Sequence, residues 1–247
     1  MLTINAENPL KAYDISNPAS PREVAAPAGI SATQFAGVDA EEGLAVVSGG
    51  TSNMSVLDIS DVDQITLVGS LPKDLGFADV TVSQGKAFIS SDVSGDPRYG
   101  VLVCDLSDPS RPVLLQTLRV PSRDTISRVR MPGNFDLEVD VTGNLLLVVA
   151  GGRLAVMLVT NLDKVQNIIT LCTDAECSES DAVHVDRDGP LAVVSGGDIT
   201  VFNVAVIART FGIRHVETPG TARGAAVKGR IAYIADGGAG LTVVRIQ

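Results

Sequence analysis

Short runs of apolar residues recur along the chain, and each run ends in small or acidic residues. Successive runs begin 42, 60, 45 and 40 residues apart. They occupy residues 44–50, 86–92, 146–152, 191–197 and 231–237. Apolar residues at nearly every position predict strands that are covered on both faces. Self-similarity at this spacing is typical of a repeat architecture.

Each apolar run has further strands on both sides. A shorter strand with alternating residues precedes it and ends in a Gly-containing turn, as in residues 80–85 and 183–189. A third strand follows the run and ends in Asp or Asn, as in residues 55–58 and 101–105. Fourth strands are predicted at residues 65–69, 113–118, 165–171 and 204–208. Four antiparallel strands in about 40–45 residues make one blade of a β-propeller.

The repeat therefore predicts an all-β protein, a five-bladed β-propeller of four-stranded antiparallel blades. The blades would begin near residues 38, 80, 139, 183 and 225, within a single domain that spans residues 1–247. No window of useful length has the period of a helix. Because a lone blade cannot bury both of its faces, we expect the blades to stack face to face around an axis.

The chain ends hold one strand more than five blades require. Residues 10–15 and 241–246 both resemble the third strand of a blade. We expect the N- and C-terminal strands to share a blade, in which residues 22–26 supply the fourth strand and residues 10–15 pair outside it. The alternative is that the sequence is an excerpt of a longer array with another ring size.

The amino-acid composition limits the kinds of partner that we expect. The core must be aliphatic, because 45% of the residues are hydrophobic while aromatic residues make up 4% and Trp is absent. The formal net charge of −10 repels nucleic acid phosphates and anionic lipid headgroups. No stretch approaches the ~20 apolar residues of a membrane span. We expect neither nucleic acid binding nor membrane insertion.

The spacing of the cysteines indicates the cellular location of the protein. Cys172 and Cys177 are five residues apart, and we expect them to close a small disulfide loop, while Cys104 sits in an apolar strand. A pair in one loop favours an oxidising compartment, so an extracellular or cell-surface location is predicted. Residues 1–11 lack the basic and apolar regions of a signal peptide, which leaves a cytoplasmic protein or a mature or trimmed chain as alternatives.

Two turns point to a family. Residues 14–21 and 105–112 share the pattern Asp-Ile/Leu-Ser-Asn/Asp-Pro, and residues 232–237 and 240–244 add two further short motifs. Together they resemble LVIVD repeats, which form propellers in bacterial and archaeal proteins that are often secreted or surface-attached. The resemblance implies the fold and an extracellular address. It carries no catalytic motif, so no functional residue is transferred.

The acids of these turns have a structural interpretation. Asp14, Asp58 and Asp105 recur at the same position of the repeat. A short carboxylate at a tight turn accepts hydrogen bonds from the amides of that turn. We therefore expect turn caps here and no binding site.

The second blade carries both long insertions. Strand polarity places the connection from the second to the third strand, 91–100, and the connection to the next blade, 119–136, on the same face, called the top face here. Long connections are commonly functional. The residues proposed to contact a ligand are Arg98, Tyr99, Arg123, Arg128, Arg130, Asp136 and Glu138. Guanidinium groups bind carboxylate and phosphate bidentately, so a protein partner or an anionic ligand is expected; the alternative is that these Arg side chains pair with acids of their own blade.

A second candidate site lies where first strands approach the axis. Carboxylates of Asp79, Glu138 and Asp181 would hold a hard cation such as Ca²⁺, or would simply keep the channel mouth hydrated. No catalytic residue is predicted, because the sequence lacks a nucleophile elbow, a phosphate-binding Gly-Lys-Ser loop and metalloprotease motifs.

A non-catalytic binding or surface scaffold is the favoured function, with its contact surface on the top face around the second blade's insertions. No cofactor is required for it. One alternative is a hydrolase or lyase that uses the acidic channel mouth, with or without Ca²⁺. The other is a structural module of a larger surface assembly.

Overall fold

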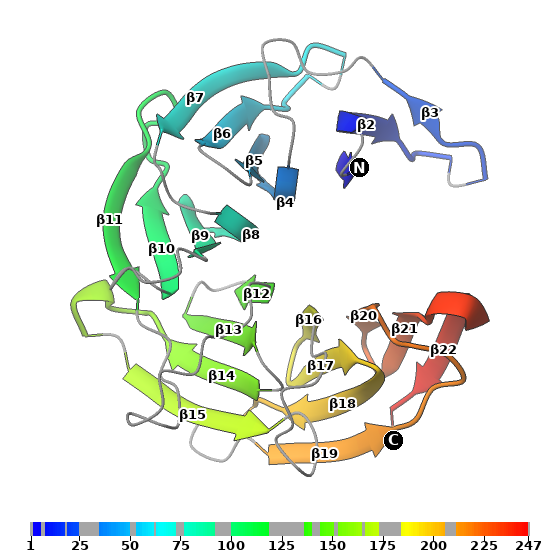
Figure 1. Ribbon diagram of the computed structural model, residues 1–247. Coiled ribbons are helices and arrows are strands. Elements are labelled where there is room, and N and C mark those ends of the chain that lie inside the picture. Colours follow the sequence, from blue (N-terminus) through cyan, green and yellow to red (C-terminus); the bar gives the residue numbers. More distant parts are fainter. Residues whose placement is uncertain are drawn as a thin grey trace. The chain divides into compact units, whose positions relative to one another are not determined.

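The computed structural model describes most of the chain as short antiparallel strands (Figure 1). The described residues are 2–5, 8–17, 19–24, 35–49, 53–61, 63–72, 77–91, 100–118, 136–139, 144–150, 153–164, 166–172, 184–205 and 211–246. They form four four-stranded and two three-stranded sheets, grouped in two compact units, Met1–Arg119 and Val120–Gln247. Within these ranges there is no α-helix, and no helix is long and apolar enough to cross a membrane. The all-β prediction is confirmed.

The first unit contains three sheets. The N-terminal sheet consists of β1 (Leu2–Asn5), β2 (Asn8–Asp14) and β3 (Arg22–Glu23). The next sheet has β4 (Phe35–Glu41), β5 (Leu44–Gly49), β6 (Asn53–Asp58) and β7 (Thr66–Pro72). The third has β8 (Phe77–Ser83), β9 (Lys86–Ser91), β10 (Gly100–Asp105) and β11 (Val113–Leu118).

The second unit also contains three sheets. Its first has β12 (Asp136–Val139), β13 (Leu145–Ala150), β14 (Arg153–Leu158) and β15 (Gln166–Cys172), with a 3-10 turn η1 (Leu162–Lys164). The next has β16 (His184–Asp188), β17 (Leu191–Gly196), β18 (Asp198–Asn203) and β19 (Phe211–Val216). The C-terminal sheet has β20 (Gly224–Lys228), β21 (Ile231–Ala235) and β22 (Leu241–Arg245), with η3 (Gly237–Ala239).

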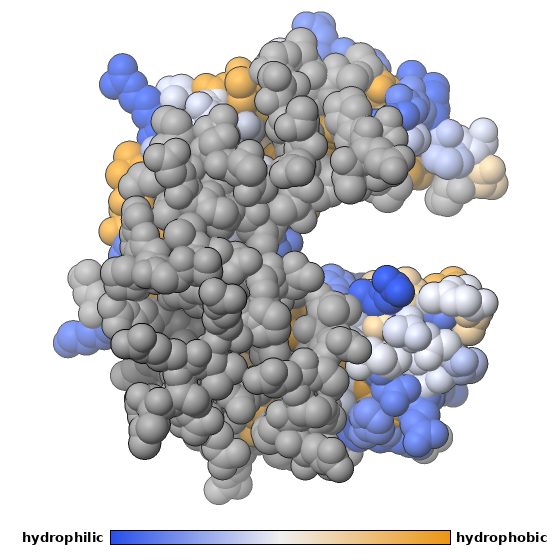
Figure 2. Space-filling view, in the orientation of Figure 1, coloured by the Kyte–Doolittle hydropathy of each residue, from blue (hydrophilic) through white to orange (hydrophobic). Residues whose placement is uncertain are grey.

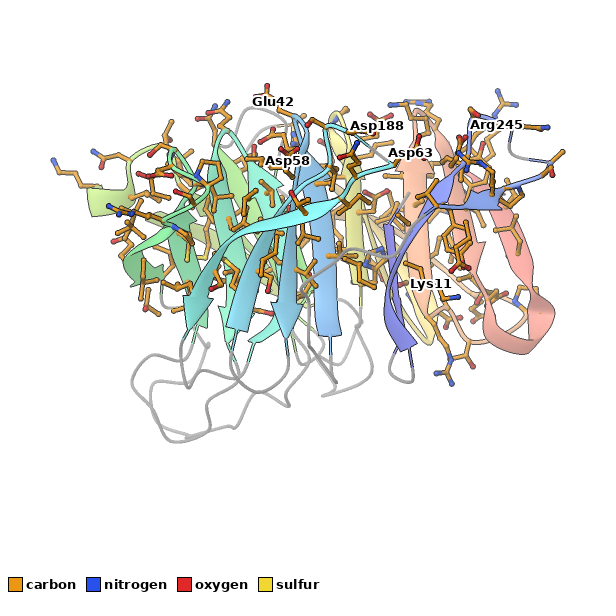
Figure 3. The ribbon with its side chains drawn as sticks, turned by 90° about the horizontal axis from the view of Figure 1, so that it is seen from above. Lys11, Glu42, Asp58, Asp63, Asp188 and Arg245 are labelled. Carbon is orange, nitrogen blue, oxygen red and sulfur yellow. The ribbon has the colours of Figure 1, made fainter. Side chains whose placement is uncertain are left out.

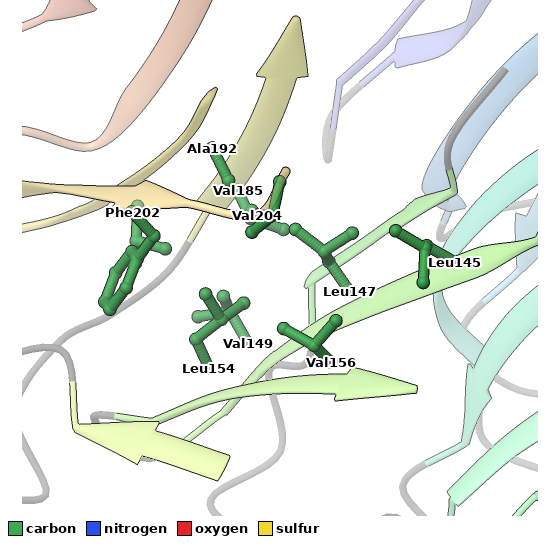
Figure 4. Packing of buried hydrophobic residues seen from close by; sticks show 10 residues of the cluster. Leu145, Leu147, Val149, Leu154, Val156, Val185, Ala192, Phe202 and Val204 are labelled. Carbon is green, nitrogen blue, oxygen red and sulfur yellow. The ribbon is translucent and has the colours of Figure 1, made fainter. Parts of the chain in front are cut away.

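Neighbouring sheets within a unit pack through aliphatic residues at fixed positions of the repeat. The third residue of the second strand and the residue opposite it on the third strand face the following sheet. These pairs are Val46 with Val56, Leu147 with Val156, and Val193 with Val201. All six residues are at most 1% exposed. Figure 4 shows Leu147 and Val156 packing with Val185 of the following sheet. The second strands β5, β13 and β17 are thus covered on both faces, as their apolar sequences predict, whereas in β21 Ile231 and Tyr233 are exposed, contrary to the prediction.

One predicted strand is wrong. The strand that pairs with β18 as the fourth of the sheet β16–β19 is Phe211–Val216, whereas the sequence predicted it at 204–208. Asn203 ends β18, and its Oδ1 atom accepts a hydrogen bond from the N–H of Ala205 at 2.9 Å. The aliphatic residues after Asn203 therefore begin a turn of the same type that Asp caps elsewhere, although their composition is that of a strand.

The terminal sheets each have three strands. β2 and β3 pair antiparallel as expected, and β1, a strand that the sequence did not indicate, pairs with the other edge of β2. Leu10 and Ala12 of β2 pack against Ala45 of β5, so the N-terminal sheet covers one face of the sheet β4–β7. Five blades and a terminal blade shared by both chain ends stay predictions.

Candidate functional site

Both long connections of the second blade leave one end of the sheet β8–β11. Ser91, the last residue of β9, pairs with Gly100, the first residue of β10. Val101, which follows Gly100, pairs with Leu118, the last residue of β11. The connection between β9 and β10 and the connection that follows β11 therefore start from adjacent strand ends. This pairing supports the prediction that the two connections lie on the same face.

The predicted contact residues fall mostly outside the described part of the chain. This holds for Arg98, Tyr99, Arg123, Arg128 and Arg130. Asp136 and Glu138 lie in β12, where their backbones pair with Val149 and Leu147 of β13. The proposed arginine cluster stays a prediction.

Of the metal candidates, Asp79 is the one whose surroundings the structure gives. Its backbone N–H lies 2.7 Å from Ser90 Oγ, and the Ser90 hydroxyl donates to the Asp79 carbonyl at 3.3 Å. Asp79 is half-buried on β8, close to Gly37 of the preceding sheet. Glu138 is placed only as part of β12, and Asp181 lies outside the described residues. Among the residues described, no three His, Cys, Asp or Glu side chains come close enough to hold a metal ion.

Two other aspartates of first strands connect neighbouring sheets. Asp39 Oδ2 accepts hydrogen bonds from the N–H of Val82 at 2.7 Å and from the hydroxyl of Thr81 at 3.1 Å. Asp186 Oδ2, at the equivalent position of β16, accepts from the N–H of Val227 on β20 at 2.6 Å. Each carboxylate thus joins the innermost strands of two adjacent sheets. Sequence reasoning missed them, although Val-Asp at the same repeat position, 38–39 and 185–186, was a usable signal.

A polar network occupies the end of the second unit where β17 passes to β18. His215 Nε2 lies 3.3 Å from Asp198 Oδ2, and its Nδ1 lies 3.3 Å from Thr200 Oγ1. The N–H of Thr218 donates to Asp198 Oδ1 at 3.0 Å, while the Thr218 hydroxyl donates to Asp236 Oδ1 at 2.7 Å. Sequence reasoning gave no sign of this pairing.

Asp236 is the buried end of this network. It is 0% exposed, and its Oδ2 atom accepts from the Thr242 hydroxyl at 2.8 Å and from the N–H of Gly220 at 3.1 Å. Burial acts to raise the pKa of Asp236, but the hydrogen bonds from Thr218, Thr242 and Gly220 outweigh it and hold the pKa below its usual range. Both carboxylate oxygens are occupied, so Asp236 organises its loop. His215 and Asp198, whose side chains are 51% and 34% exposed, remain reachable from solvent.

Several acids of the first unit lie in turns at the strand ends opposite to the two long connections. Figure 3 shows Glu42, Asp58 and Asp63 at this end. Asp14, Asp58 and Asp105 each accept the N–H two residues ahead, that of Ser16, Ser60 and Ser107 respectively, at 2.9 Å. The hydroxyl of Ser60 also donates to Asp58 Oδ1, and this bond is the largest cause that lowers the pKa of Asp58. The backbone hydrogen bonds are the largest cause that holds the pKa of Asp14 and Asp105 below their usual range. The prediction of turn caps is confirmed.

Comparison with known proteins supports the repeat assignment. The sequence model of the LVIVD repeat matches residues 6–26, 78–119 and 219–246. These ranges contain β2 and β3, most of the sheet β8–β11, and the C-terminal sheet. No curated protein sequence matches the chain.

Solved structures of low sequence identity share the fold. Hydrazine synthase from Kuenenia stuttgartiensis is 14% identical with a TM-score of 0.71, over 99% of this chain and 79% of that chain. The periplasmic gluconolactonase of Pseudomonas aeruginosa is 13% identical with a TM-score of 0.69, over 92% and 70%. A protein from Lactobacillus plantarum is 14% identical with a TM-score of 0.67, over 96% and 77%. Likeness at these identities establishes a β-propeller fold and no activity.

Proposed function

We propose that this LVIVD-repeat protein with a β-propeller fold is a non-catalytic binding scaffold. Its contact surface is the end of the sheet β8–β11 from which the two long connections leave. The register that sets Ser91 beside Gly100, and Val101 beside Leu118, is the observation that supports this choice. Connections that begin at adjacent strand ends are positioned to contact the same ligand.

The chemistry of the connections favours an anionic ligand or an acidic protein partner. Arg98, Arg123, Arg128 and Arg130 lie in them, within a chain whose formal net charge is −10. Guanidinium groups bind carboxylate, sulfate and phosphate through paired hydrogen bonds. At the opposite end of the first unit, carboxylates such as Asp58 and Asp105 cap turns and repel anions.

Binding to immobilised heparin, a sulfated polysaccharide, tests the proposal. Wild-type protein is expected to be retained at low salt and released by salt, because the Debye length falls from about 10 Å at 0.1 M to about 3 Å at 1 M. The double variant Arg128→Ala, Arg130→Ala should elute at clearly lower salt with an unchanged melting temperature.

A matched pair of arginines at the other end of the strands supplies the control. Arg22→Ala, Arg111→Ala removes the same charge from exposed positions in the first unit. This variant should elute with the wild type. Flow-through of the wild type at low salt, or equal shifts for the two double variants, would overturn the proposed surface.

The alternative of a hydrolase or lyase rests on a cation at the acidic residues of the first strands. Elemental analysis of the purified protein separates it from the scaffold. Stoichiometric Ca²⁺ that is lost in an Asp79→Asn variant would favour the alternative and a site at this residue. The similarity to a gluconolactonase, at 13% identity, transfers no catalytic residue to this chain.

We also propose an extracellular or cell-surface location, supported by the spacing of Cys172 and Cys177. Cys172 is the last residue of β15, and Cys177 lies outside the described residues. Cys104 lies buried on β10. Mass spectrometry of protein made in an oxidising compartment should find the peptides of the pair lighter by two hydrogens, and two free thiols would contradict the location.

A further inference from the structure

A histidine and an aspartate of neighbouring strands face each other at one end of the sheet β16–β19. His215 lies near the end of β19, and Asp198 is the first residue of β18. His215 Nε2 and Asp198 Oδ2 are 3.3 Å apart, and the two side chains are 51% and 34% exposed. An imidazole nitrogen and a carboxylate oxygen that solvent can reach therefore converge on one place.

The separation of these two atoms fits two ligands of one zinc ion. Zn–N and Zn–O bonds are about 2.0–2.2 Å long, so two ligand atoms at a tetrahedral angle lie about 3.3–3.5 Å apart. A direct N–H···O hydrogen bond is usually about 2.7–3.2 Å long, so His215 and Asp198 are slightly farther apart than such a bond requires. A Zn²⁺ ion can therefore take the place of the proton between the two atoms without a shift of either strand.

Thr200 orients the imidazole ring of His215. The two residues pair across β18 and β19, and Thr200 Oγ1 lies 3.3 Å from His215 Nδ1. A hydroxyl group donates or accepts, so it accommodates both neutral tautomers of the ring. When the proton is on Nδ1 and is donated to Thr200, the lone pair of Nε2 is directed toward Asp198. Histidine ligands of metal ions are oriented in this way by a hydrogen bond from their other ring nitrogen.

The carboxylate of Asp198 is oriented by the connection between β19 and β20. The N–H of Thr218 donates to Asp198 Oδ1 at 3.0 Å, while Oδ2 is directed to His215. The turn before Asp198 is held by the same connection, because the N–H of Ala222 donates to the carbonyl of Gly197 at 2.8 Å. Both candidate ligands are thus oriented before an ion binds, which reduces the entropic cost of binding.

The pair leaves most of the coordination sphere of an ion open. Among the described residues, no third His, Cys, Asp or Glu side chain joins it. Water or a ligand atom of a bound molecule completes the coordination, as at the open position of a catalytic zinc site. Figure 2 shows that the visible surface around the C-terminal sheet includes many blue, hydrophilic residues. The imidazole favours Zn²⁺ over Ca²⁺ and Mg²⁺, because the latter two prefer oxygen ligands.

We propose that His215 and Asp198 bind a divalent transition-metal ion, with Zn²⁺ as the expected ion, and that Thr200 is a positioning residue of this site. In the neutral ring, Nε2 gives up its proton to the ion's place and Nδ1 carries one instead, so binding needs no net loss of a proton. The site is independent of the proposed binding surface on the sheet β8–β11 and of the cation considered at Asp79.

Titration of the full chain, without a histidine tag, with up to about 1 mM Zn²⁺ tests the site by nitrogen NMR of the histidine rings. The Nε2 signal of His215 should shift, and Tm should rise with the zinc concentration because the ion binds the folded protein. His215→Gln and Asp198→Asn should each remove both responses. Asp198→Asn retains an acceptor oxygen for the N–H of Thr218, so the connection between β19 and β20 should keep its place.

Thr200 supplies a test that does not remove a ligand. Thr200→Val should weaken zinc binding about tenfold or more with an unchanged Tm in the absence of zinc, because the ring loses its orienting partner. Thr200→Ser retains the hydroxyl and should bind zinc as the wild type does. If His215→Gln does not fold, this pair of variants decides the question, and equal zinc affinity of Thr200→Val and Thr200→Ser overturns the positioning role.

Two further variants control for adventitious binding. His184→Gln removes the other imidazole of the chain, and Glu217→Gln removes an exposed carboxylate two residues after His215. Both should respond to Zn²⁺ like the wild type, and Ca²⁺ at the same concentration should leave the His215 signal unchanged. An unshifted His215 signal in the wild type, a zinc response that persists in His215→Gln, or an equal response to Ca²⁺ overturns the proposal.

Discussion

The N-terminal and C-terminal sheets each have three strands, and each packs an aliphatic side against a neighbouring four-stranded sheet. Leu10 and Ala12 form that side in the first, and Ala232 and Ile234 form it in the second. Their other sides differ in chemistry. Lys11 and its neighbours make a polar surface with internal hydrogen bonds, whereas the C-terminal sheet carries exposed apolar residues there, namely Ile231, Tyr233, Leu241 and Val243.

The comparison shows that the repeat constrains the packed side of a terminal sheet and does not constrain the other side. A side that packs on the next sheet must match it, so aliphatic residues recur there in both terminal sheets. A side without a neighbouring sheet is under no such requirement, and a polar surface suffices for solubility. The C-terminal sheet nevertheless carries exposed aliphatic residues on this side, whereas the N-terminal sheet carries Lys11 and Glu23 there.

The largest effects are expected on the packed sides. Leu10→Ala and Ile234→Ala should each lower the free energy of unfolding by about 2–5 kcal/mol, because both residues are at most 1% exposed and leave cavities. Leu241→Ala, measured in dilute protein, should change it by less than about 0.5 kcal/mol. Urea unfolding measures all three, and a Leu241→Ala cost as large as that of Leu10→Ala would remove the distinction between the two sides.

Carboxylates between first strands should have the next largest effect. Asp186→Ala leaves the buried N–H of Val227 without its acceptor and should cost about 1–3 kcal/mol. Asp39→Ala removes the equivalent bond to Val82 and should cost a similar amount.

Asp186→Asn is the control for the first of these, because it retains an acceptor oxygen in the same place. Hydrogen exchange should show faster exchange of the Val227 amide in Asp186→Ala and little change in Asp186→Asn. Equal stability of Asp186→Ala and the wild type would mean that packing alone holds the C-terminal sheet.

A pair of amide variants compares one acid from each terminal sheet. Asp14 accepts the turn amide of Ser16 through one oxygen, so Asp14→Asn can keep this bond. Asp236 accepts through both oxygens, and Asp236→Asn replaces one acceptor with an NH₂ group that faces donors. Asp236→Asn should therefore lower the urea midpoint clearly, and Asp14→Asn should leave it nearly unchanged.

The pH dependence follows from the same bonds. The pKa of each carboxyl is lower in the folded protein than its ordinary value near 3.9, so its contribution is present above about pH 4 and is lost as pH falls through the folded pKa. Wild-type protein should lose stability in that window, and Asp236→Asn should lose less of it than the wild type. Parallel acid profiles for the wild type and Asp236→Asn would contradict the role of Asp236.

Much of the fold could be predicted from the sequence because its repeat places similar residues in similar surroundings. Apolar runs such as the one in β5 became second strands that are covered on both faces, and acids such as Asp58 became turn caps. The fourth strand after Asn203 was misplaced because the aliphatic residues of a turn have the composition of a strand. Amino-acid composition indicates only that a segment favours a strand. Here the hydrogen bond to the Asn203 side chain stabilises a turn instead.

The polar contacts and the exposed apolar residues of the C-terminal sheet were less accessible to sequence reasoning. Asp39 and Asp186 are polar residues that alternate with apolar ones in their strands, a pattern that normally indicates exposure. Their hydrogen-bond partners lie more than 40 residues away, in the next sheet. The apolar run at 231–237 was expected to be covered on both faces, and Ile231 and Tyr233 in it are 38% and 42% exposed. Alternation shows that two residues share a side of a strand, and it does not show whether another sheet covers that side.

The smallest effect is expected on the polar side of the N-terminal sheet. Lys11 Nζ and Glu23 Oε2 lie 3.0 Å apart, and their side chains are 37% and 49% exposed. The hydrogen bond and the charge of Glu23 raise the pKa of Lys11, so the contribution of the pair is complete below the ordinary Lys value near 10.4 and is lost as pH rises through the folded pKa.

Lys11→Ala should therefore lower the urea midpoint slightly at pH 7, less so in 1 M salt, and not at all once Lys11 is neutral, because exposed pairs are screened and weak. Lys228→Ala on the C-terminal sheet is the matched control, since its Nζ lies 3.5 Å from Asp188 and its side chain is 83% exposed. Both variants should differ little from the wild type in unfolding. A Lys11→Ala effect comparable to that of Leu10→Ala would mean that the polar side of the N-terminal sheet stabilises the fold as its packed side does, and the contrast between the sides would then not hold.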